Sequence, residues 1–345
     1  PSSLERIGYS VIYGVTGVTN VNIPKGLKTA DVCWNNDGPF AGSKVNTVTF
    51  ESGMTKIPDN MMKNCKELKT VTIPYTVQEI GQYAFDSCSS LEKIEIPRIV
   101  KTIGHDAFAH TNLQELNLPS SLEKIGYSII YGVTRVTSVN IPKGVKTADV
   151  CWNNDGPFAG SKVNTVTFES GMTKIPDNMM KNCKELKTVT IPYTVQEIGQ
   201  YAFDSCSSLE KIEIPRIVKT IGHDAFAHTN LQELNLPSSL EKIGYSIIYG
   251  VTRVTSVNIP KGVKTADVCW NNDGPFAGSK VNKVTFEKGT KLIPANLFSN
   301  ASQLREVKLL DEMTDIDSYA FENCTNLRSI ELPISIKTIG DGAFS

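Results

Sequence analysis

The chain of 345 residues lacks the features that mark several common classes of protein. Its formal net charge is −1, with 35 Lys and Arg against 36 Asp and Glu. Such a balance offers no basic face to nucleic acid or to an anionic membrane, so no nucleic-acid partner is expected. No apolar run approaches the roughly 18 residues of a membrane-spanning helix, and no membrane insertion is expected within this chain. The eight cysteines form no C-x-x-C pair, which argues against zinc.

Signatures of catalysis are also missing from the sequence. No nucleophile–base pair, paired-carboxylate pocket or phosphate-binding glycine loop stands out. The motif His105-Asp106-Ala107-Phe108-Ala109-His110 combines two histidines with an aspartate but contains no nucleophile. Solvated surface histidines are therefore favoured over a metal site or an acid–base pair. We expect no enzyme, no cofactor and no metal.

What the sequence does contain is repetition. Residues 119–236 repeat residues 1–118 with five substitutions, and Pro237–Asn282 repeats Pro119–Asn164 without a mismatch. An array whose parts contact only their neighbours can be lengthened in this way, because each new block adds its own interface. The block is itself composite, with units that begin at Leu68, Leu91, Leu113, Val136 and Val163. Their lengths of 22 to 27 residues are typical of leucine-rich-repeat solenoids.

One unit, Leu68–Ser90, shows the physical basis of the repeat. Apolar and polar residues alternate through Val71-Thr72-Ile73, which predicts a half-buried strand. Pro74 ends this strand because proline donates no ladder hydrogen bond. Val77 and Ile80 are expected to point inward, and Gly81 to permit a turn. The segment 82–87 is compatible with one helical turn that places Ala84 and Phe85 in the core. Stacking of successive coils then buries the apolar residues in one column.

The frame L-x-x-[IV]-x-I-P-x-x-[VL]-x-x-I-G-x-x-A-F-x-x-C resembles the BspA-like leucine-rich repeat of bacterial surface proteins. It is clearest at Leu68–Cys88, Leu186–Cys206 and Leu304–Cys324. The resemblance implies an α/β fold: a right-handed solenoid with a parallel sheet on its concave face and short helical turns and loops on its convex face. One solenoid is expected over residues 1–345, made of blocks 1–118, 119–236 and 237–282 followed by diverged units over 283–345.

Candidate ligand-binding residues are the outward positions of the expected concave sheet, the third and fifth of each unit. They are polar and short or mildly charged, without an aromatic residue. Such a face suits hydrogen bonding to a sugar or to an extended polar chain, and its recurrence about every 24 Å favours a repetitive ligand bound through avidity. The candidates are Thr70, Thr72, Lys93, Glu95, Glu115, Asn117, Ser138, Asn140, Thr165, Thr167, Lys211 and Glu213.

The 27-residue units replace the I-G-x-x-A-F segment with T-A-D-V-C-W-N-N-D-G-P-F. In the second block, Trp152 and Phe158 flank the turn-forming residues Asn153–Gly156, which lack the ligand spacing of a calcium loop. Exposed aromatic residues make good contact anchors, so these two are candidates for a convex loop contact. The alternative is that they fill the interior of a bulge.

Several cysteines occupy equivalent positions of successive units, Cys65 and Cys88 among them. The spacing of stacked coils, about 4.8 Å, lies within the Cα range of a disulfide. A disulfide staple is therefore one interpretation. A small buried core residue that repeats in register is the other, and the one we favour, because free cysteine packs as a small hydrophobe.

Two functions are compatible with this sequence. The leading hypothesis is a non-catalytic adhesion or recognition module outside the cell, bound to a host or matrix protein or glycan polymer. The other is a structural spacer or self-assembling coat that has no specific ligand. We expect an extracellular, cell-surface location, with the signal and anchor segments outside this chain because both ends fall inside a repeat unit.

Overall fold

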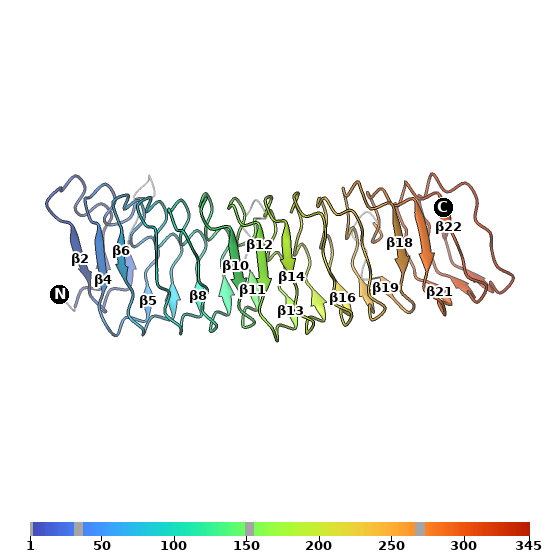
Figure 1. Cartoon of the computed structure of the whole chain (residues 1–345), viewed down its shortest axis with the longest axis horizontal. Helices are drawn as coiled ribbons and strands as arrows, with labels where there is room; N and C mark the ends of the chain where they lie inside the picture. The colour runs from blue at the N-terminus through green and yellow to red at the C-terminus, as the bar shows by residue number, and fades with distance from the viewer. Residues whose placement is uncertain (1–2, 31–36, 149–154, 266–272) are drawn as a thin grey trace. The chain divides into compact units, whose positions relative to one another are not determined.

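The computed structural model describes residues 3–30, 37–148, 155–265 and 273–345. Within these ranges the regular structure consists of short β-strands, and no helix is present. The chain divides into two compact units: unit 1 comprises Pro1–Glu169 and Lys181–Glu185, and unit 2 comprises Ser170–Met180 and Leu186–Ser345. Each unit is a parallel-strand solenoid, in which each coil contributes up to two strands (Figure 1).

The first strand of each coil follows the alternating segment of the repeat. We call the surface formed by these strands, and by the equivalent segments of other coils, the first-strand face. In unit 1 its strands are β2 (Asn20–Ile23), β4 (Thr47–Phe50), β6 (Thr70–Thr72), β10 (Ser138–Ile141) and β12 (Thr165–Phe168). In unit 2 they are β14 (Thr188–Thr190), β18 (Ser256–Ile259), β20 (Lys283–Phe286) and β22 (Glu306–Val307).

A second strand follows later in each coil. In the unit Leu68–Ser90 it ends at Ile80, directly before Gly81. These strands form the second-strand sheets, which the sequence did not predict. Those of unit 1 are β1 (Arg6–Ile7), β3 (Thr29–Ala30), β5 (Lys56–Ile57), β7 (Glu79–Ile80), β8 (Thr102–Ile103), β9 (Lys124–Ile125) and β11 (Thr147–Ala148). Those of unit 2 are β13 (Lys174–Ile175), β15 (Glu197–Ile198), β16 (Thr220–Ile221), β17 (Lys242–Ile243), β19 (Lys264–Thr265), β21 (Leu292–Ile293), β23 (Asp315–Ile316) and β24 (Thr338–Ile339).

All pairs within a unit are parallel and in register, so equivalent residues of successive coils lie beside one another. On the first-strand face Val139 pairs with Val166 and Asn140 with Thr167. In the second-strand sheet of unit 1 the order is β11-β9-β8-β7-β5, and Ile57, Ile80 and Ile103 form one row. This register produces the shared apolar column that the repeat predicts.

The predicted helical turn over 82–87 is not present. Tyr83 and Ser87 take left-handed backbone angles, with φ of 53° and 60°. Alternate amides, those of Tyr83, Phe85 and Ser87, donate across to the next coil, to the carbonyls of His105, Ala107 and Ala109 at 2.8–2.9 Å. An α-helix would direct these donors to residues four positions earlier in the same coil. Stacking thus gives the amides partners between coils and replaces the helix with a series of turns.

Gly81 has a role that differs from the expected turn, because its φ is not positive. A Cβ atom at this position would lie 2.6 Å from the Asp59 nitrogen and 2.8 Å from the Ile57 carbonyl oxygen. The glycine therefore permits close approach of two coils. The same crowding recurs at Gly104, where a Cβ would meet the backbone of Gln82 at 2.5 Å.

The core agrees with the inward positions of the repeat. Leu68, Val77, Ile80, Phe85 and Cys88 are all 0% exposed. Rings from successive coils stack along the interior of each unit. In unit 2 the centroid separations are 5.7, 5.2 and 5.2 Å along the series Phe276, Phe298, Phe321, Phe344. Such a column is the geometric consequence of in-register coils.

Candidate functional site

The predicted ligand-binding positions lie on the first-strand face and point outward. Eleven of the twelve side chains are exposed, and Thr165 is half-buried. Those that lie in strands are Thr70, Thr72, Ser138, Asn140, Thr165 and Thr167. The others, Lys93, Glu95, Glu115, Asn117, Lys211 and Glu213, lie in segments that form no strand. The strands on this face are parallel, as the repeat implies, but the sheet is interrupted at these segments.

The composition of the outward positions differs along the strand ladder. Strands such as β4 and β10 have Thr, Ser or Asn at their outward positions, whereas β20 and β22 pair Lys283 with Glu306. The unpaired segments 91–96 and 113–118 carry Glu and Lys there, residues with low strand propensity. Ile94 and Ile96 of segment 91–96 are half-buried, whereas Val48 and Phe50 of β4 are 0% and 2% exposed and Leu116 of segment 113–118 is 5% exposed.

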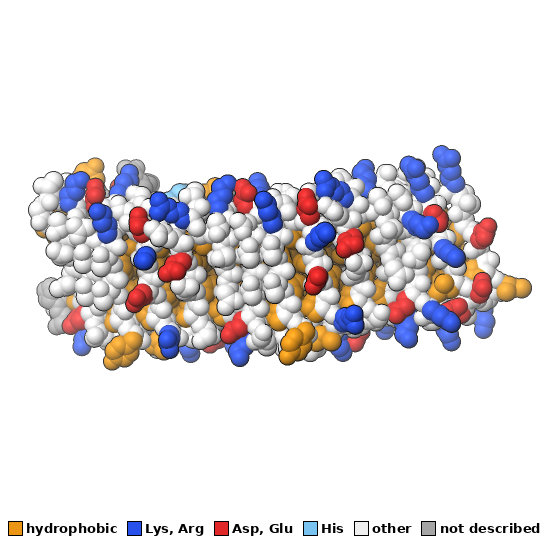
Figure 2. Space-filling model, viewed as in Figure 1, with side chains coloured by type: hydrophobic (Ala, Val, Ile, Leu, Met, Phe, Trp, Pro, Cys, Tyr) orange, Lys and Arg blue, Asp and Glu red, His pale blue; other side chains and the backbone are white. Residues whose placement is uncertain are grey.

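Clefts open on the first-strand face where the ladder is interrupted. In unit 2 a cleft of about 410 Å³ lies between segment 233–236 and the strands β18 and β20. In unit 1 a cleft of about 520 Å³ adjoins segment 92–93. Figure 2 shows zones in which hydrophobic side chains are visible between the coils.

The cleft beside β18 brings the predicted positions together. It is lined by Glu233, Leu234, Asn235, Leu236, Ser256, Val257, Asn258, Lys283 and Thr285. Six of these residues stand 118 positions after Glu115, Asn117, Ser138, Asn140, Thr165 and Thr167. The equivalents of all six positions, 118 residues further along the chain, therefore surround a single concavity in unit 2, where lysine replaces the threonine at one of them.

The cleft has an apolar floor and a polar rim. Leu234 and Val257 are each 4% exposed and form the floor. The sequence analysis did not identify these two residues as part of a site, because it considered outward polar positions. Among the rim residues, the Thr285 hydroxyl donates to Asn258 Oδ1 at 2.9 Å. Concave sites with an apolar lining and a few placed polar groups are typical of ligand binding.

The predicted convex contact is wrong for Phe158, which is 0% exposed. Its burial supports the alternative that this side chain fills the interior of the long unit. Trp152 lies outside the residues that the structure describes.

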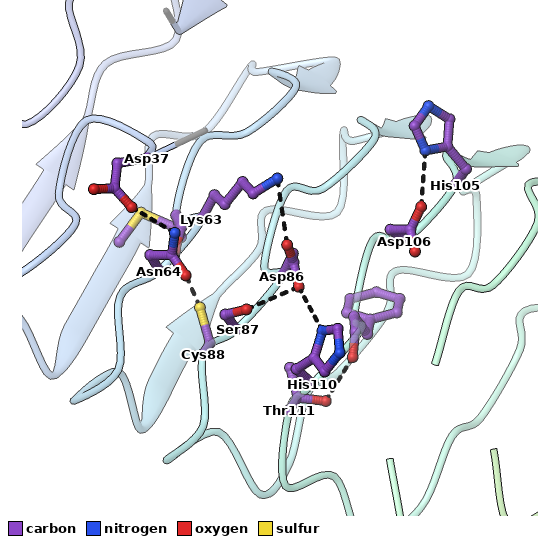
Figure 3. Close-up of polar contacts among 12 residues, drawn as sticks. Asp37, Lys63, Asn64, Asp86, Ser87, Cys88, His105, Asp106, His110 and Thr111 are labelled. Atoms are coloured by element: carbon purple, nitrogen blue, oxygen red, sulfur yellow. Dashed lines mark hydrogen bonds and ion pairs between the residues drawn. The ribbon is translucent and has the colours of Figure 1, made fainter. Parts of the chain in front are cut away.

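The histidine motif does not assemble a common site. His110 Nδ1 lies 3.1 Å from Asp86 Oδ1, and His105 Nδ1 lies 3.1 Å from Asp106 Oδ2 (Figure 3). His105 also stacks on Tyr127, with 4.4 Å between ring centroids. The two rings thus engage different carboxylates, and within the described ranges no group of three potential metal ligands occurs.

Asp86 connects His110 to a lysine that the sequence reasoning missed. Lys63 Nζ lies 3.4 Å from Asp86 Oδ2 and 3.8 Å from the centroid of the Tyr83 ring. Lys63 and Asp86 are only 6% and 7% exposed, and Figure 3 shows Asp86 between Lys63 and His110. Burial, followed by the charge of Asp106, raises the pKa of Tyr83 to about 12. No sequence signal marks this buried ion pair, because its partners are 23 residues apart and belong to neighbouring coils.

The five described cysteines are buried free thiols. Cys65 Sγ donates to the Phe40 carbonyl at 3.2 Å, and Cys88 Sγ to that of Met62 at 3.1 Å. Burial raises the pKa of Cys65 to about 12 and that of Cys88 well above its ordinary value. The structure therefore favours a core residue over a disulfide staple.

This arrangement predicts slow alkylation. The thiolate is the reactive form, and a thiol with a pKa of about 12 is ionised to only about one part in 10⁴ at pH 8. We expect iodoacetamide to leave Cys65, Cys88, Cys183, Cys206 and Cys324 unlabelled in the folded protein, as read by peptide mass spectrometry. Denaturation without reductant should expose all eight cysteines to label. A pair that resists labelling under those conditions would reveal a disulfide and contradict this prediction.

The repeating coils and their parallel strands define the class of protein as a leucine-rich-repeat solenoid. The BspA type leucine-rich repeat region, in six copies, matches residues 35–152, 153–273 and 270–345. The chain therefore belongs to the BspA type leucine-rich-repeat family.

Several solved structures of bacterial leucine-rich repeat proteins are similar to this chain, and the first of those below supports the fold. A leucine-rich repeat protein from Bacteroides ovatus is 24% identical, with 94% of this chain and 84% of that chain covered and a TM-score of 0.57. The pneumococcal vaccine antigen PcpA is 22% identical over 96% of this chain and 83% of that chain, with a TM-score of 0.49. A leucine-rich repeat protein from Eubacterium ventriosum is 23% identical over 87% and 82%, with a TM-score of 0.44.

No curated protein matches the sequence. Across the described parts of the chain, no helix has the length and hydropathy needed to cross a membrane.

Proposed function

We propose that this protein is a non-catalytic recognition module of the bacterial cell surface. Its ligand is a host or matrix polymer, protein or glycan, that binds along the first-strand face. The surface location rests on the resemblance of the repeat to those of bacterial surface proteins. The polar rims and apolar floors of the clefts support binding rather than chemistry, and the described thiols and histidines are engaged within the solenoid.

The observation that carries this proposal is the cleft beside β18. The equivalents of six outward positions that the repeat predicts surround it in unit 2. The same positions occur in unit 1 in the same order along the chain, from Glu115 to Thr167. We therefore propose a second, similar site in unit 1, and a ligand that repeats along its length as the one that engages both.

Two similar sites predict avidity. Asn140 and Asn258 are exposed and occupy the same position in the two blocks. An arginine at either position places a long charged side chain over its cleft. We expect Asn140→Arg or Asn258→Arg to lower the apparent affinity for an immobilised polymer by about 10²-fold, because bivalent engagement is lost. The measurement is surface plasmon resonance on a panel of matrix proteins and glycans, with the double variant expected to show no retention.

The matched control for this experiment is Gln78→Arg, which adds the same charge at an exposed position away from the first-strand face. It should bind as the unchanged chain does. The proposal would be contradicted if no protein or glycan of the panel bound the unchanged chain, or if the double variant bound as well as the control. Either result would favour a spacer without a ligand.

A further inference from the structure

One edge of β18 has no strand partner within unit 2. On its other edge β18 pairs with β20, where Lys283 N donates to Thr255 O at 3.2 Å and Glu287 N to Ile259 O at 2.9 Å. Main-chain groups of alternate residues in a strand point to opposite sides. The N–H and C=O groups of Ser256 and Asn258 therefore point away from β20 and toward segment 233–236.

Segment 233–236 does not pair with these groups, because it forms no strand. The cleft of about 410 Å³ occupies the space between the segment and β18. Its volume lies within the range of about 300–1,000 Å³ that is usual for ligand sites. The result is a sheet edge that is recessed in a groove, with Leu234 and Val257 beneath it.

Main-chain donors and acceptors that repeat along a strand are matched by another polypeptide in the extended conformation. Peptide recognition by strand addition uses this match, and pockets for alternate side chains give it specificity. The hydroxyl groups of a glycan have no corresponding repeat along a strand. The floor of Leu234 and Val257 fits apolar side chains at every second residue, and the exposed Ser256 and Asn258 fit small polar ones between them.

We propose that β18 is an acceptor strand for an extended segment of a partner polypeptide with alternating apolar and small polar side chains. The segment adds to the free edge of β18 in the cleft. This inference rests on the proposed recognition function and names the class of its ligand.

The equivalent strand of unit 1, β10, has the same arrangement. Asn164 N donates to Thr137 O at 2.8 Å and Glu169 N to Ile141 O at 2.9 Å, which directs the main chain of Ser138 and Asn140 away from β12. Val139 and Leu116 are each 5% exposed, close to the 4% of their equivalents Val257 and Leu234. Strand β10 is therefore a second candidate acceptor strand.

The recess favours a single inserted segment over a second copy of the solenoid. Exposed sheet edges tend to pair with one another and cause aggregation. Here segment 233–236 stands in front of β18 and lines the opposite wall of the cleft. A narrow chain can enter this space, whereas the edge of another folded solenoid brings its own neighbouring coils.

The test uses the full chain and a fluorescein-labelled probe peptide, Lys-Thr-Val-Thr-Val-Thr-Glu. For a probe that lies parallel to β18, as β20 does, with its valines toward the floor, the valine amides face β18 and the threonine amides face away. N-methylation of both valine amides should weaken binding at least about tenfold, the effect of two lost hydrogen bonds, in fluorescence anisotropy. N-methylation of the threonine amides at the fourth and sixth positions of the probe is the matched control and should leave most of the affinity.

Variants of the chain test whether the probe binds at β18 and β10. Proline lacks an N–H and is tolerated at sheet edges, so Asn258→Pro removes a donor that β20 does not use. We expect Asn258→Pro to remove one bound probe per chain, and the double variant with Asn140→Pro to remove two. Thermal unfolding checks that each variant is folded. If a proline variant does not fold, the methylated probes still test the inference on the unchanged chain.

Three results would overturn the inference. The first is that the unmethylated probe shows no saturable binding at probe concentrations up to about 1 mM, which would place any dissociation constant above that value. The second is equal binding of the valine-methylated and unmethylated probes. The third is self-association of the chain that Asn258→Pro abolishes, because the occupant is then a second copy. If the arginine variants still lose the polymer panel, the recognition function stands and only the polypeptide class falls.

Discussion

Phe298→Ala is expected to lower the free energy of unfolding of the coils around it by about 3–5 kcal/mol. Phe298 is 0% exposed. Its ring stacks between Phe276 and Phe321, with centroids 5.7 and 5.2 Å away, and meets Phe286 edge-on at 6.2 Å. Removal of the ring leaves a cavity in a column whose register is fixed by backbone hydrogen bonds, so the neighbours can relax only partly.

Urea unfolding and hydrogen exchange measure this loss. Solenoid stability is a sum of nearest-neighbour terms, so the effect should be local. The amides of Phe298 and Asn300 donate to Ala320 and Glu322 of the next coil and should exchange faster. Phe344→Ala is the matched control, because that ring stacks on one neighbour only and is 43% exposed. Equal shifts of the urea midpoint in the two variants would contradict a cooperative column.

The core of each coil could be predicted from the sequence because the physical demand repeats at every unit. Leu68, Val77, Ile80 and Phe85 recur at fixed spacing and all are fully buried. Apolar periodicity records which side chains must leave water, and in a stacked array that choice is the same for each coil. The first strands followed from the same alternation.

The second-strand sheets and the turns of segment 82–87 could not be predicted in this way. Their hydrogen bonds join main-chain atoms of neighbouring coils, as in the donation from Phe85 N to Ala107 O. Main-chain atoms are the same for nearly all residues, so the side-chain pattern does not report their partners. Gly81 is an example. The sequence indicated that a glycine is needed at this position, but the reason is its close approach to Asp59 of the previous coil, which depends on how the coils stack.

For the candidate residues, the sequence could predict the direction of the side chains but not which segments pair. Alternation determines which side chains point outward, and Thr70 and Asn140 are exposed as expected. The same alternation occurs in the Lys93–Glu95 segment, which forms no strand, so alternation does not determine pairing. The clefts arise from that failure of pairing. The residues that interrupt the sheet thus create the concave sites on which the proposed recognition depends.

Asp86→Ala is expected to cost about 3–5 kcal/mol, because it removes one partner of a buried ion pair. Lys63 is 6% exposed, and its ammonium group would keep the ring of Tyr83 but lose its carboxylate partner. Asp86 also holds His110, with Nδ1 and Oδ1 3.1 Å apart, so this histidine should gain mobility as well. Thermal and urea unfolding report the loss, and the linewidths of the His110 ring protons in NMR spectra report the mobility.

The exposed pair of Lys56 and Glu79 supplies the control for this prediction. Its atoms are closer, at 2.7 Å, but the side chains are 43% and 42% exposed. Removal of a solvated partner costs at most about 1 kcal/mol, so Glu79→Ala should have a small effect. Lys63→Met combined with Asp86→Ala should recover much of the stability, because the unpaired charge is gone. If Asp86→Ala destabilises the chain no more than Glu79→Ala does, burial does not govern the energetics of this pair, and Lys63 must reach solvent in the folded state.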